Sequence, residues 1–359
     1  MARLDSFLRM VVDQKASDLH FHSGTVPIIR HDGDLVTLPF RSLSEEETAR
    51  FVMEIMTPEQ RAVFEKQKQI DFAYVVEGCA RFRVNIFMQS RGIGSVFRVV
   101  PDVMPTLEQL RLPPAIRRLA KYPNGLVLVT GATGSGKSTT LAAMVNEVNR
   151  TMRKHIITLE DPIEFVHVPR ESIVTQRQVG KHVDTFAAAL RSALRESPDV
   201  VVVGEMRDFE TVSLAVSAAE TGVLVFGTLH TNSAAKAVDR IIDMCPEELH
   251  EQMRNVVSTL LKGVVAQSLC KRANGEGRAA LTEILLNNYA VANMIRENKT
   301  FQLDGYLASG EALASGMQSL DQSILARVKE GEITAEDALR YARYPDTLKT
   351  LLATIPEDA

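Results

Sequence analysis

The sequence has few cysteines, and their spacing argues against a domain held together by zinc or by disulfides. Its three cysteines, Cys79, Cys245 and Cys270, are odd in number and lie far apart. No Cys-x-x-Cys pair occurs, so the sequence predicts neither a zinc module nor a disulfide framework. We expect all three to be buried, reduced thiols of a cytosolic protein.

Long apolar runs and an excess of positive charge are also missing. No stretch approaches the length of a membrane-spanning helix, and residues 1–7 show no signal-peptide pattern. The formal net charge is −4, and no basic stretch is interleaved with aromatic residues, which argues against a nucleic-acid partner. We therefore expect a soluble, cytoplasmic protein that reaches a membrane only through a partner.

The chain is long enough for two hydrophobic cores. It has 359 residues, of which 45% are hydrophobic and 24% are charged. Residues 1–100 combine helical periodicity near residues 4–12 and 44–68 with a strictly alternating run at 80–88, in which Phe82, Val84 and Ile86 face inward. Four prolines between 101 and 114 indicate an extended linker. We predict an N-terminal α+β domain over 1–100, a linker over 101–114 and a second domain over 115–359.

From residue 124 the pattern changes to an α/β alternation. Apolar strand-like runs lie at 126–130, 155–160, 200–203 and 223–229, and helical segments separate them. This alternation predicts a parallel sheet with helices on its faces. From about residue 246 to the end we expect mainly helices.

A phosphate-binding loop directly follows the first of these runs. Residues 131–138 read Gly-Ala-Thr-Gly-Ser-Gly-Lys-Ser, the G-x-x-x-x-G-K-[ST] pattern, with a strand before it and a helix after it. The backbone of such a loop surrounds nucleotide phosphates, its lysine reaches the β- and γ-phosphates, and its last hydroxyl is a ligand for Mg²⁺. Neither D-x-x-G nor N-K-x-D follows, so a GTPase has no support and we expect ATP with Mg²⁺. The predicted nucleotide-binding residues are Gly131, Thr133, Gly134, Ser135, Gly136, Lys137, Ser138 and Thr139, and Ser138 is also a predicted metal ligand.

The other three strand-like runs also end in polar residues. Ligands of open α/β sheets bind at the carboxyl ends of the strands. Glu205 follows the run 200–203, and we expect it to orient Mg²⁺, directly or through water, or to polarise the attacking water.

Two further strand ends supply catalytic candidates. Glu160, Asp161 and Glu164 follow the run 155–160, and Glu164 is the candidate general base, although a structural role for any one of the three is as well supported. His230 follows the run 223–229 and is a candidate for sensing the γ-phosphate, with a structural role as the alternative.

Together these segments resemble the secretion-type ring ATPases, and within them the PilT-like pilus retraction motors. Residues 131–144 are similar to their Walker A segment, 156–167 to their aspartate box, 197–208 to their Walker B segment and 227–234 to their histidine box. The N-terminal stretches 16–20 and 80–85 also resemble family segments, so the likeness covers nearly the whole chain.

The resemblance implies a PAS-like N-terminal domain, a RecA-like P-loop ATPase domain with a helical C-terminal region, and a hexameric ring. It implies a motor that hydrolyses ATP to power type IV pilus retraction and twitching motility. Its implied partners are an inner-membrane pilus platform protein, through which it lies at the membrane, and a paralogous retraction ATPase. Arg81 and Arg83 match arginines that approach the nucleotide in such rings, and Arg98 is a weaker candidate; a solvated strand face is the alternative for all three.

One position departs from the retraction motors. Their Ala-Ile-Arg-Asn segment corresponds here to residues 290–293, where Ala292 replaces the arginine. Accessory PilU-like retraction ATPases also lack that arginine, and residues 331–340 resemble their tail, whereas residues 204–208 resemble the principal motors. The accessory motor therefore stays open as an alternative, as does a pilus or type II secretion assembly ATPase. A RecA-like nucleic-acid motor has less support.

Overall fold

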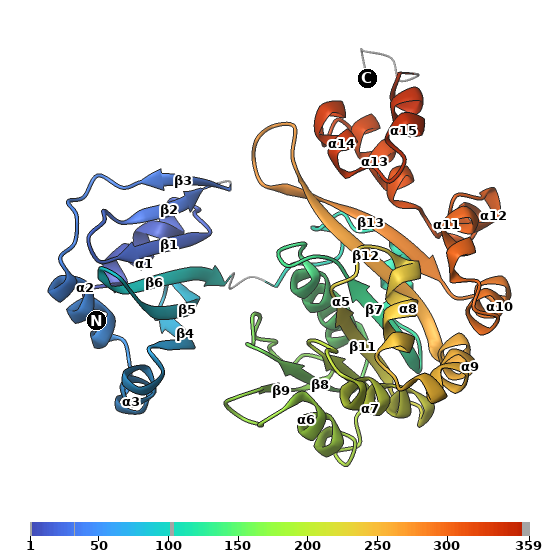
Figure 1. The fold of residues 1–359 in the computed structure, drawn as a ribbon, viewed down its shortest axis with the longest axis horizontal. Coiled ribbons are helices and arrows are strands. Elements are labelled where there is room, and N and C mark those ends of the chain that lie inside the picture. Colours follow the sequence, from blue (N-terminus) through green and yellow to red (C-terminus); the bar gives the residue numbers. More distant parts are fainter. Residues whose placement is uncertain (1, 32, 101–103, 354–359) are drawn as a thin grey trace. The chain divides into compact units, whose positions relative to one another are not determined.

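The computed structural model describes residues 2–31, 33–100 and 104–353 (Figure 1). The chain divides into two compact units, Met1–Val103 and Met104–Ala359. Each unit has its own hydrophobic core and is described by itself.

The first unit is built on an antiparallel sheet of six strands in the order β3-β2-β1-β6-β5-β4. Phe82, Val84 and Ile86 on β5 are fully buried, which confirms the predicted alternation. Capping boxes at Ser44 and Thr57 begin the second and third helices. The strands are β1 (Asp18–His22), β2 (Ile28–His31), β3 (Asp34–Thr37), β4 (Gln69–Val76), β5 (Ala80–Gln89) and β6 (Gly92–Val100), and the helices are α1 (Asp5–Asp13), α2 (Glu45–Glu54) and α3 (Pro58–Gln67).

Part of the predicted linker belongs to the second unit. Residues 101–103 lie outside the described residues. Leu107 and Leu112 are buried in the core of the second unit, and a turn joins them. The expectation of an extended segment is therefore wrong for 107–112, because these two leucines gain apolar contacts by folding back.

The second unit contains a seven-stranded sheet in the order β13-β12-β7-β11-β10-β8-β9. All neighbouring strands are parallel except the antiparallel pair β12 and β13. The four strands predicted from apolar runs are confirmed, and so is the α/β fold class. The strands are β7 (Gly125–Thr130), β8 (His155–Glu160), β9 (Ile173–Gln178), β10 (Val200–Val203), β11 (Leu224–Leu229), β12 (Leu261–Lys271) and β13 (Arg278–Leu286).

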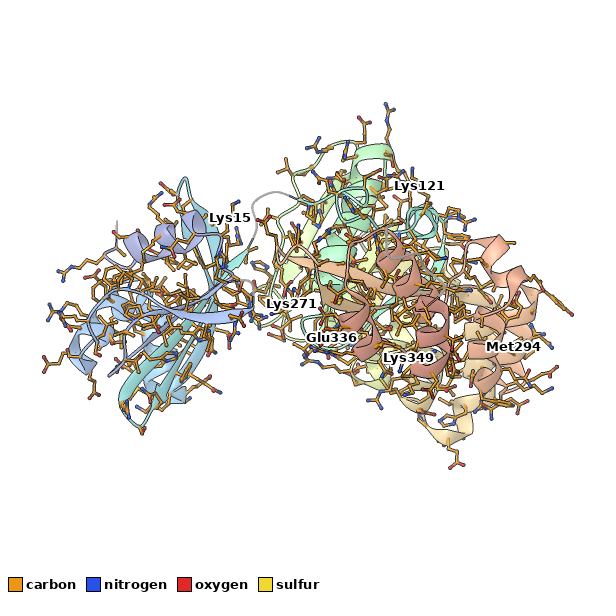
Figure 2. The ribbon with its side chains drawn as sticks, turned by 90° about the horizontal axis from the view of Figure 1, so that it is seen from above. Lys15, Lys121, Lys271, Met294, Glu336 and Lys349 are labelled. Carbon is orange, nitrogen blue, oxygen red and sulfur yellow. The ribbon has the colours of Figure 1, made fainter. Side chains whose placement is uncertain are left out.

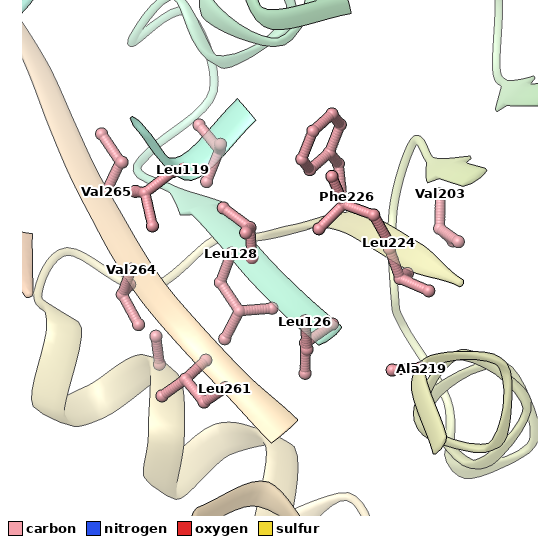
Figure 3. Packing of buried hydrophobic residues seen from close by; sticks show 14 of the residues in the cluster. Leu119, Leu126, Leu128, Val203, Ala219, Leu224, Phe226, Leu261, Val264 and Val265 are labelled. Carbon is pink, nitrogen blue, oxygen red and sulfur yellow. The ribbon is translucent and has the colours of Figure 1, made fainter. Parts of the chain in front are cut away.

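Helices cover this sheet and bury its strands β7, β10 and β11 on both faces. Every residue of β7 is buried, and α5, α7, α8 and α9 all pack against that strand. Leu126 and Leu128 of β7 lie among Phe226 of β11 and Leu261 and Val264 of β12 (Figure 3). The helices are α4 (Pro114–Ala120), α5 (Lys137–Thr151), α6 (Phe186–Ala193), α7 (Phe209–Glu220), α8 (Ala234–Asp243), α9 (His250–Leu260), α10 (Tyr289–Arg296), α11 (Leu303–Leu307), α12 (Gly310–Ser315), α13 (Leu320–Lys329), α14 (Ala335–Tyr341) and α15 (Pro345–Leu352), with short 3₁₀ turns at Glu247–Leu249 and Thr300–Gln302.

The expectation of a mainly helical region after residue 246 is wrong for residues 261–286. They form a long hairpin, in which β12 pairs with β7 and places Val264 and Val265 in the core. Burial on both faces removes the alternation that marks a half-exposed strand, so this run resembles a buried helix in sequence.

Two further sequence-level expectations concern thiols and membrane spans. Cys245 and Cys270 are free and buried, whereas Cys79 is only half-buried because it lies in the turn before β5. Within the described residues, we find no helix with the length and apolar character needed to cross a bilayer.

Candidate functional site

The candidate site forms at the carboxyl edge of the second sheet. Strands β7, β8, β10 and β11 are parallel, so the segments that follow them meet at this edge. These segments carry the phosphate loop, the acidic group around Glu164, Glu205 and His230.

The phosphate loop is held in a backbone conformation that favours glycine, and at Gly131 and Gly136 there is also no room for a side chain. Gly131 and Gly136 have φ angles of 144° and 86°. A Cβ atom on Gly131 would lie 2.3 Å from the carbonyl oxygen of Gln267, and one on Gly136 would lie 2.8 Å from Gln267 Nε2. Helix α5 begins at Lys137, so its positive end faces the loop.

Gln267 on β12 is a positioning residue that the sequence did not reveal. Its side-chain amide donates to the carbonyl of Ser135 at 2.8 Å, and its Oε1 accepts from the Thr140 hydroxyl at 2.7 Å. It is 4% exposed, so both bonds are shielded from water. One side chain thus fixes the loop to the first turn of α5.

Lys137 interacts electrostatically with both predicted catalytic carboxylates. Its ammonium donates to the carbonyls of Gly131 at 2.7 Å and Ala132 at 3.0 Å. Burial lowers the pKa of Lys137, while the negative charges of Glu205 and Glu164 act in the opposite direction. The structure therefore brings these three predicted residues together.

Glu205 follows β10 and is held by two basic side chains. Arg207 Nη2 donates to Glu205 Oε2 at 2.5 Å, and His230 Nε2 lies 3.0 Å from Glu205 Oε1. The hydrogen bond from Arg207, with the charges of Arg207 and His230, lowers the pKa of Glu205 against the effect of burial. Glu205 is thus an ionised carboxylate, as a metal-orienting acid must be.

The acidic group after β8 divides into residues with different surroundings. Glu160 is nearly buried and accepts from Thr158 Oγ1 at 2.6 Å and Gln176 Nε2 at 3.0 Å. Burial raises the pKa of Glu160, and the neighbouring charge of Glu164 acts in the same direction. Glu164 is half-buried and acts electrostatically on Lys137, whereas Asp161 interacts with Arg207. Glu160 therefore fits a structural role, and Glu164 is the member of the group whose charge acts on the lysine of the phosphate loop.

The site contains buried oxygen atoms that fit a nucleotide and a hard cation. Thr130 Oγ1, Ser135 Oγ and Thr231 Oγ1 are buried and have no hydrogen-bond partner within the part of the chain that the structure describes. Buried polar atoms cost free energy unless they are paired, so phosphate oxygens or metal-bound water would satisfy them. Ser138 is exposed in the first turn of α5, and oxygen donors of this kind are the ligands of Mg²⁺.

The predicted arginines belong to the first unit. Arg81 and Arg83 are half-buried and point to the face of β5 opposite the buried Phe82 and Val84. Arg83 pairs across the strands with Arg98, whose Nε donates to Asp18 Oδ1 at 2.8 Å. This face of the first sheet is therefore mainly basic, with Asp18 beside Arg98 and with Asp71 opposite Asn85.

Known proteins of the same kind match nearly the whole chain. The chain is 48% identical over 322 residues to the twitching motility protein of Neisseria gonorrhoeae, covering 90% of this chain and 86% of that protein. The chain is 46% identical to the type IV pilus retractation ATPase PilT of Pseudomonas aeruginosa, covering 96% of this chain and 99% of that protein. It is 40% identical to the type IV pilus ATPase PilU of the same organism, covering 97% of this chain and 91% of that protein. A crystal structure of the pilus retraction motor PilT with bound ADP has a TM-score of 0.87 and 42% identity, and covers 98% of this chain and 99% of that chain. The family profile of the type II/IV secretion system proteins matches residues 2–340, and the chain belongs to this family.

Proposed function

We propose that this protein is a ring ATPase that converts ATP hydrolysis into retraction of a type IV pilus, and so powers twitching motility. The observation that carries the proposal is that the phosphate loop, Glu164 and Glu205 all follow parallel strands at one edge of the second sheet. The names of the relatives, a retraction ATPase and a twitching motility protein, direct this chemistry to pilus retraction.

Each residue of the site has a task in the proposed mechanism. Backbone amides of residues 131–136 and the positive end of α5 bind the phosphates, and Lys137 neutralises their charge. Ser138 and Glu205 would hold Mg²⁺, which supplies positive charge to the phosphate oxygens. Glu164 positions the attacking water, and His230, next to Glu205, hydrogen-bonds the γ-phosphate.

The same proposal includes a homohexamer whose sites are shared between subunits. Arg81 and Arg83 have the charge needed to stabilise the transferred phosphoryl group, and they lie on one face of β5. In a ring they would serve the phosphate loop of the adjacent subunit, with Arg98 and Asp18 beside them.

The proposed setting is the cytoplasmic side of the inner membrane. A pilus machine needs a platform protein in that membrane, and the motor would bind it peripherally. A paralogous retraction ATPase is a further candidate partner, and nucleic acid is not a proposed substrate.

A second candidate is the accessory role of a PilU-like ATPase. It rests on two observations: α10 carries Ala292 where the principal motors carry an arginine, and residues 331–340 resemble the tail of the accessory ATPases. The accessory ATPase would use the same ATP chemistry but would not drive retraction alone.

A deletion strain that is scored for surface pili, twitching and retraction tests both candidates. Excess surface pili without twitching would identify the principal motor, and normal pili with weakened retraction the accessory one. Re-expression of the Lys137→Ala variant should fail to restore the phenotype that the parent restores. Unchanged pili, motility and retraction in the deletion strain would contradict the proposal.

A further inference from the structure

A hollow of about 370 Å³ lies on the second unit, away from the residues of the nucleotide site. Tyr122, Lys262, Asn287, Tyr289, Ala292 and Arg296 are among its lining residues. They come from the end of α4, the start of β12, the end of β13 and α10. Hollows of this volume accommodate a few side chains of a ligand.

The hollow is separated from the nucleotide site by the length of a strand. Lys262 lies at the amino end of β12, which pairs in parallel with β7, whereas the phosphate loop follows the carboxyl end of β7. Six residues of strand span roughly 20 Å. In Figure 2, Met294 on α10 and Lys271 at the carboxyl end of β12 lie on opposite sides of the second unit. Occupation of the hollow therefore leaves the nucleotide site open.

The charge of the hollow has one sign. Among its described lining residues, two are basic and none is acidic. Lys262 lies over the ring of Tyr122, with Nζ 5.9 Å from the ring centroid, and no ion pair joins it to a described carboxylate. Arg296 has Glu297 next to it, but the carboxylate of Glu297 is paired with Lys299 at 2.6 Å. The two cations are thus available to an external anion.

Aromatic and amide groups complete the hollow. Tyr289 is 85% exposed, which is unusual for so large a side chain and typical of binding surfaces. Both hydrogen bonds of the Asn287 amide nitrogen go to the backbone, at Ser258 and Leu261, whereas its buried Oδ1 has no partner among the described residues. A ligand with both N–H donors and carboxylates fits this set.

We propose that the hollow binds an acidic peptide segment of a partner protein. Carboxylates of the segment pair with Lys262 and Arg296, an N–H group of its backbone donates to Asn287 Oδ1, and its side chains pack on Tyr122 and Tyr289. Two cations are too few for a nucleic acid, whose binding depends on many phosphate contacts. The site does not depend on the role in pilus retraction.

Binding of a short fluorescein-labelled peptide of Glu, Asp and Gly, measured by fluorescence polarisation on the full-length protein, tests this proposal. The parent should bind it, more weakly as salt is raised, and should not bind a matched peptide with Lys in place of Glu and Asp. The double variant Lys262→Glu, Arg296→Glu should bind about tenfold more weakly, because two attractions become repulsions.

A charge-matched control separates the hollow from the overall charge of the chain. Lys271→Glu with Lys349→Glu changes the net charge equally at two exposed positions outside the hollow, both labelled in Figure 2, and should leave binding unchanged. Retained ATP hydrolysis shows that the double variants are folded. If the variant with two glutamates does not fold, the double variant Lys262→Gln, Arg296→Gln replaces it in the binding measurement. The proposal is overturned if the parent does not prefer the acidic peptide, or if both charge-matched double variants bind it equally.

Discussion

The two sheets of this molecule present chemistry in different ways. The first is antiparallel, with one buried and one polar face, and its charged residues Asp18, Arg83 and Arg98 lie in a row across that polar face. The second is largely parallel, its strands β7, β10 and β11 are buried on both faces, and the charged residues of the candidate site lie beyond the ends of such strands. A face supplies a broad charged surface, whereas an edge gathers groups from several strands around one point. We therefore expect the edge of the second sheet to carry the residues that bind and hydrolyse the nucleotide, which must be placed accurately. We expect the polar face of the first sheet to carry charges that act on a neighbouring molecule.

The largest effect should come from the loop at the edge. Lys137→Ala should abolish ATP hydrolysis, because it removes charge neutralisation of the phosphates while no core packing is lost. Turnover is measured by phosphate release, with the exposed Lys181→Ala as the matched control. Parental turnover in Lys137→Ala would remove the ATPase assignment.

The two carboxylates at the edge should come next. Glu205→Gln and Glu164→Gln keep shape but remove charge, so each should lower kcat by about 10³ while ATP still binds. Binding of a fluorescent ATP analogue separates the two effects. A variant that hydrolyses ATP at the parental rate would lose its proposed role, and the edge would have one catalytic acid fewer.

The face of the first sheet should show an effect across subunits. Arg83→Ala alone should lower turnover by about 10². When it is mixed with Lys137→Ala subunits, some interfaces join an intact loop to intact arginines, so activity should reappear. If subunit exchange is verified and turnover equals the sum of the separate variants, Arg83 does not act across the interface.

A smaller effect should come from Gln267, the side chain that fixes the phosphate loop to α5. Gln267→Ala leaves the Ser135 carbonyl and the Thr140 hydroxyl unpaired, at a cost of about 2 kcal/mol. We expect a Tm lower by roughly 4–8 °C and a raised KM for ATP. Ser268→Ala, the next residue on the same strand, is the control. Unchanged Tm and KM would show that the loop is fixed without this side chain.

The smallest effect should come from surface charge on the first unit. Hydrogen bonds from Arg41, together with the backbone of Ser44, lower the pKa of Glu47 to about 2. A lowered pKa stabilises the fold above the ordinary value of about 4.3, and this contribution is lost as the pH falls towards 2.

The Glu47→Gln variant isolates that contribution, because Gln keeps the capping box but not the charge. The difference in Tm between the parent and this variant should shrink as the pH is lowered from 5 to 2. A difference that does not change with pH would contradict the assignment.

The parts of the fold that the sequence predicted share a local signal. The run at 126–130 is followed by the glycine-rich phosphate loop, and the run at 200–203 by Gly204 and Glu205. The alternation at 80–88 marks the buried side chains one by one. The phosphate loop and the strand ends were predictable for the same reason, because each pattern lies within a few residues.

The parts that were missed depend on contacts between distant residues. Gln267 is one polar residue within an apolar run, and its partner Ser135 is 132 positions earlier in the chain. Leu107 and Leu112 follow a proline-rich stretch that indicates a linker, but the core of the second unit covers them. In both cases tertiary packing decides the structure, and no local pattern reports it.

The late position of β12 in the chain has a consequence for synthesis. The phosphate loop leaves the ribosome complete, but Gln267, which fixes it, is made 132 residues after Ser135. At a synthesis rate of about 5–20 residues per second, Gln267 is added on the order of ten seconds after the loop. Nascent chains stopped before residue 261 should therefore carry the whole nucleotide motif and yet retain ATP more weakly than chains stopped well beyond residue 286.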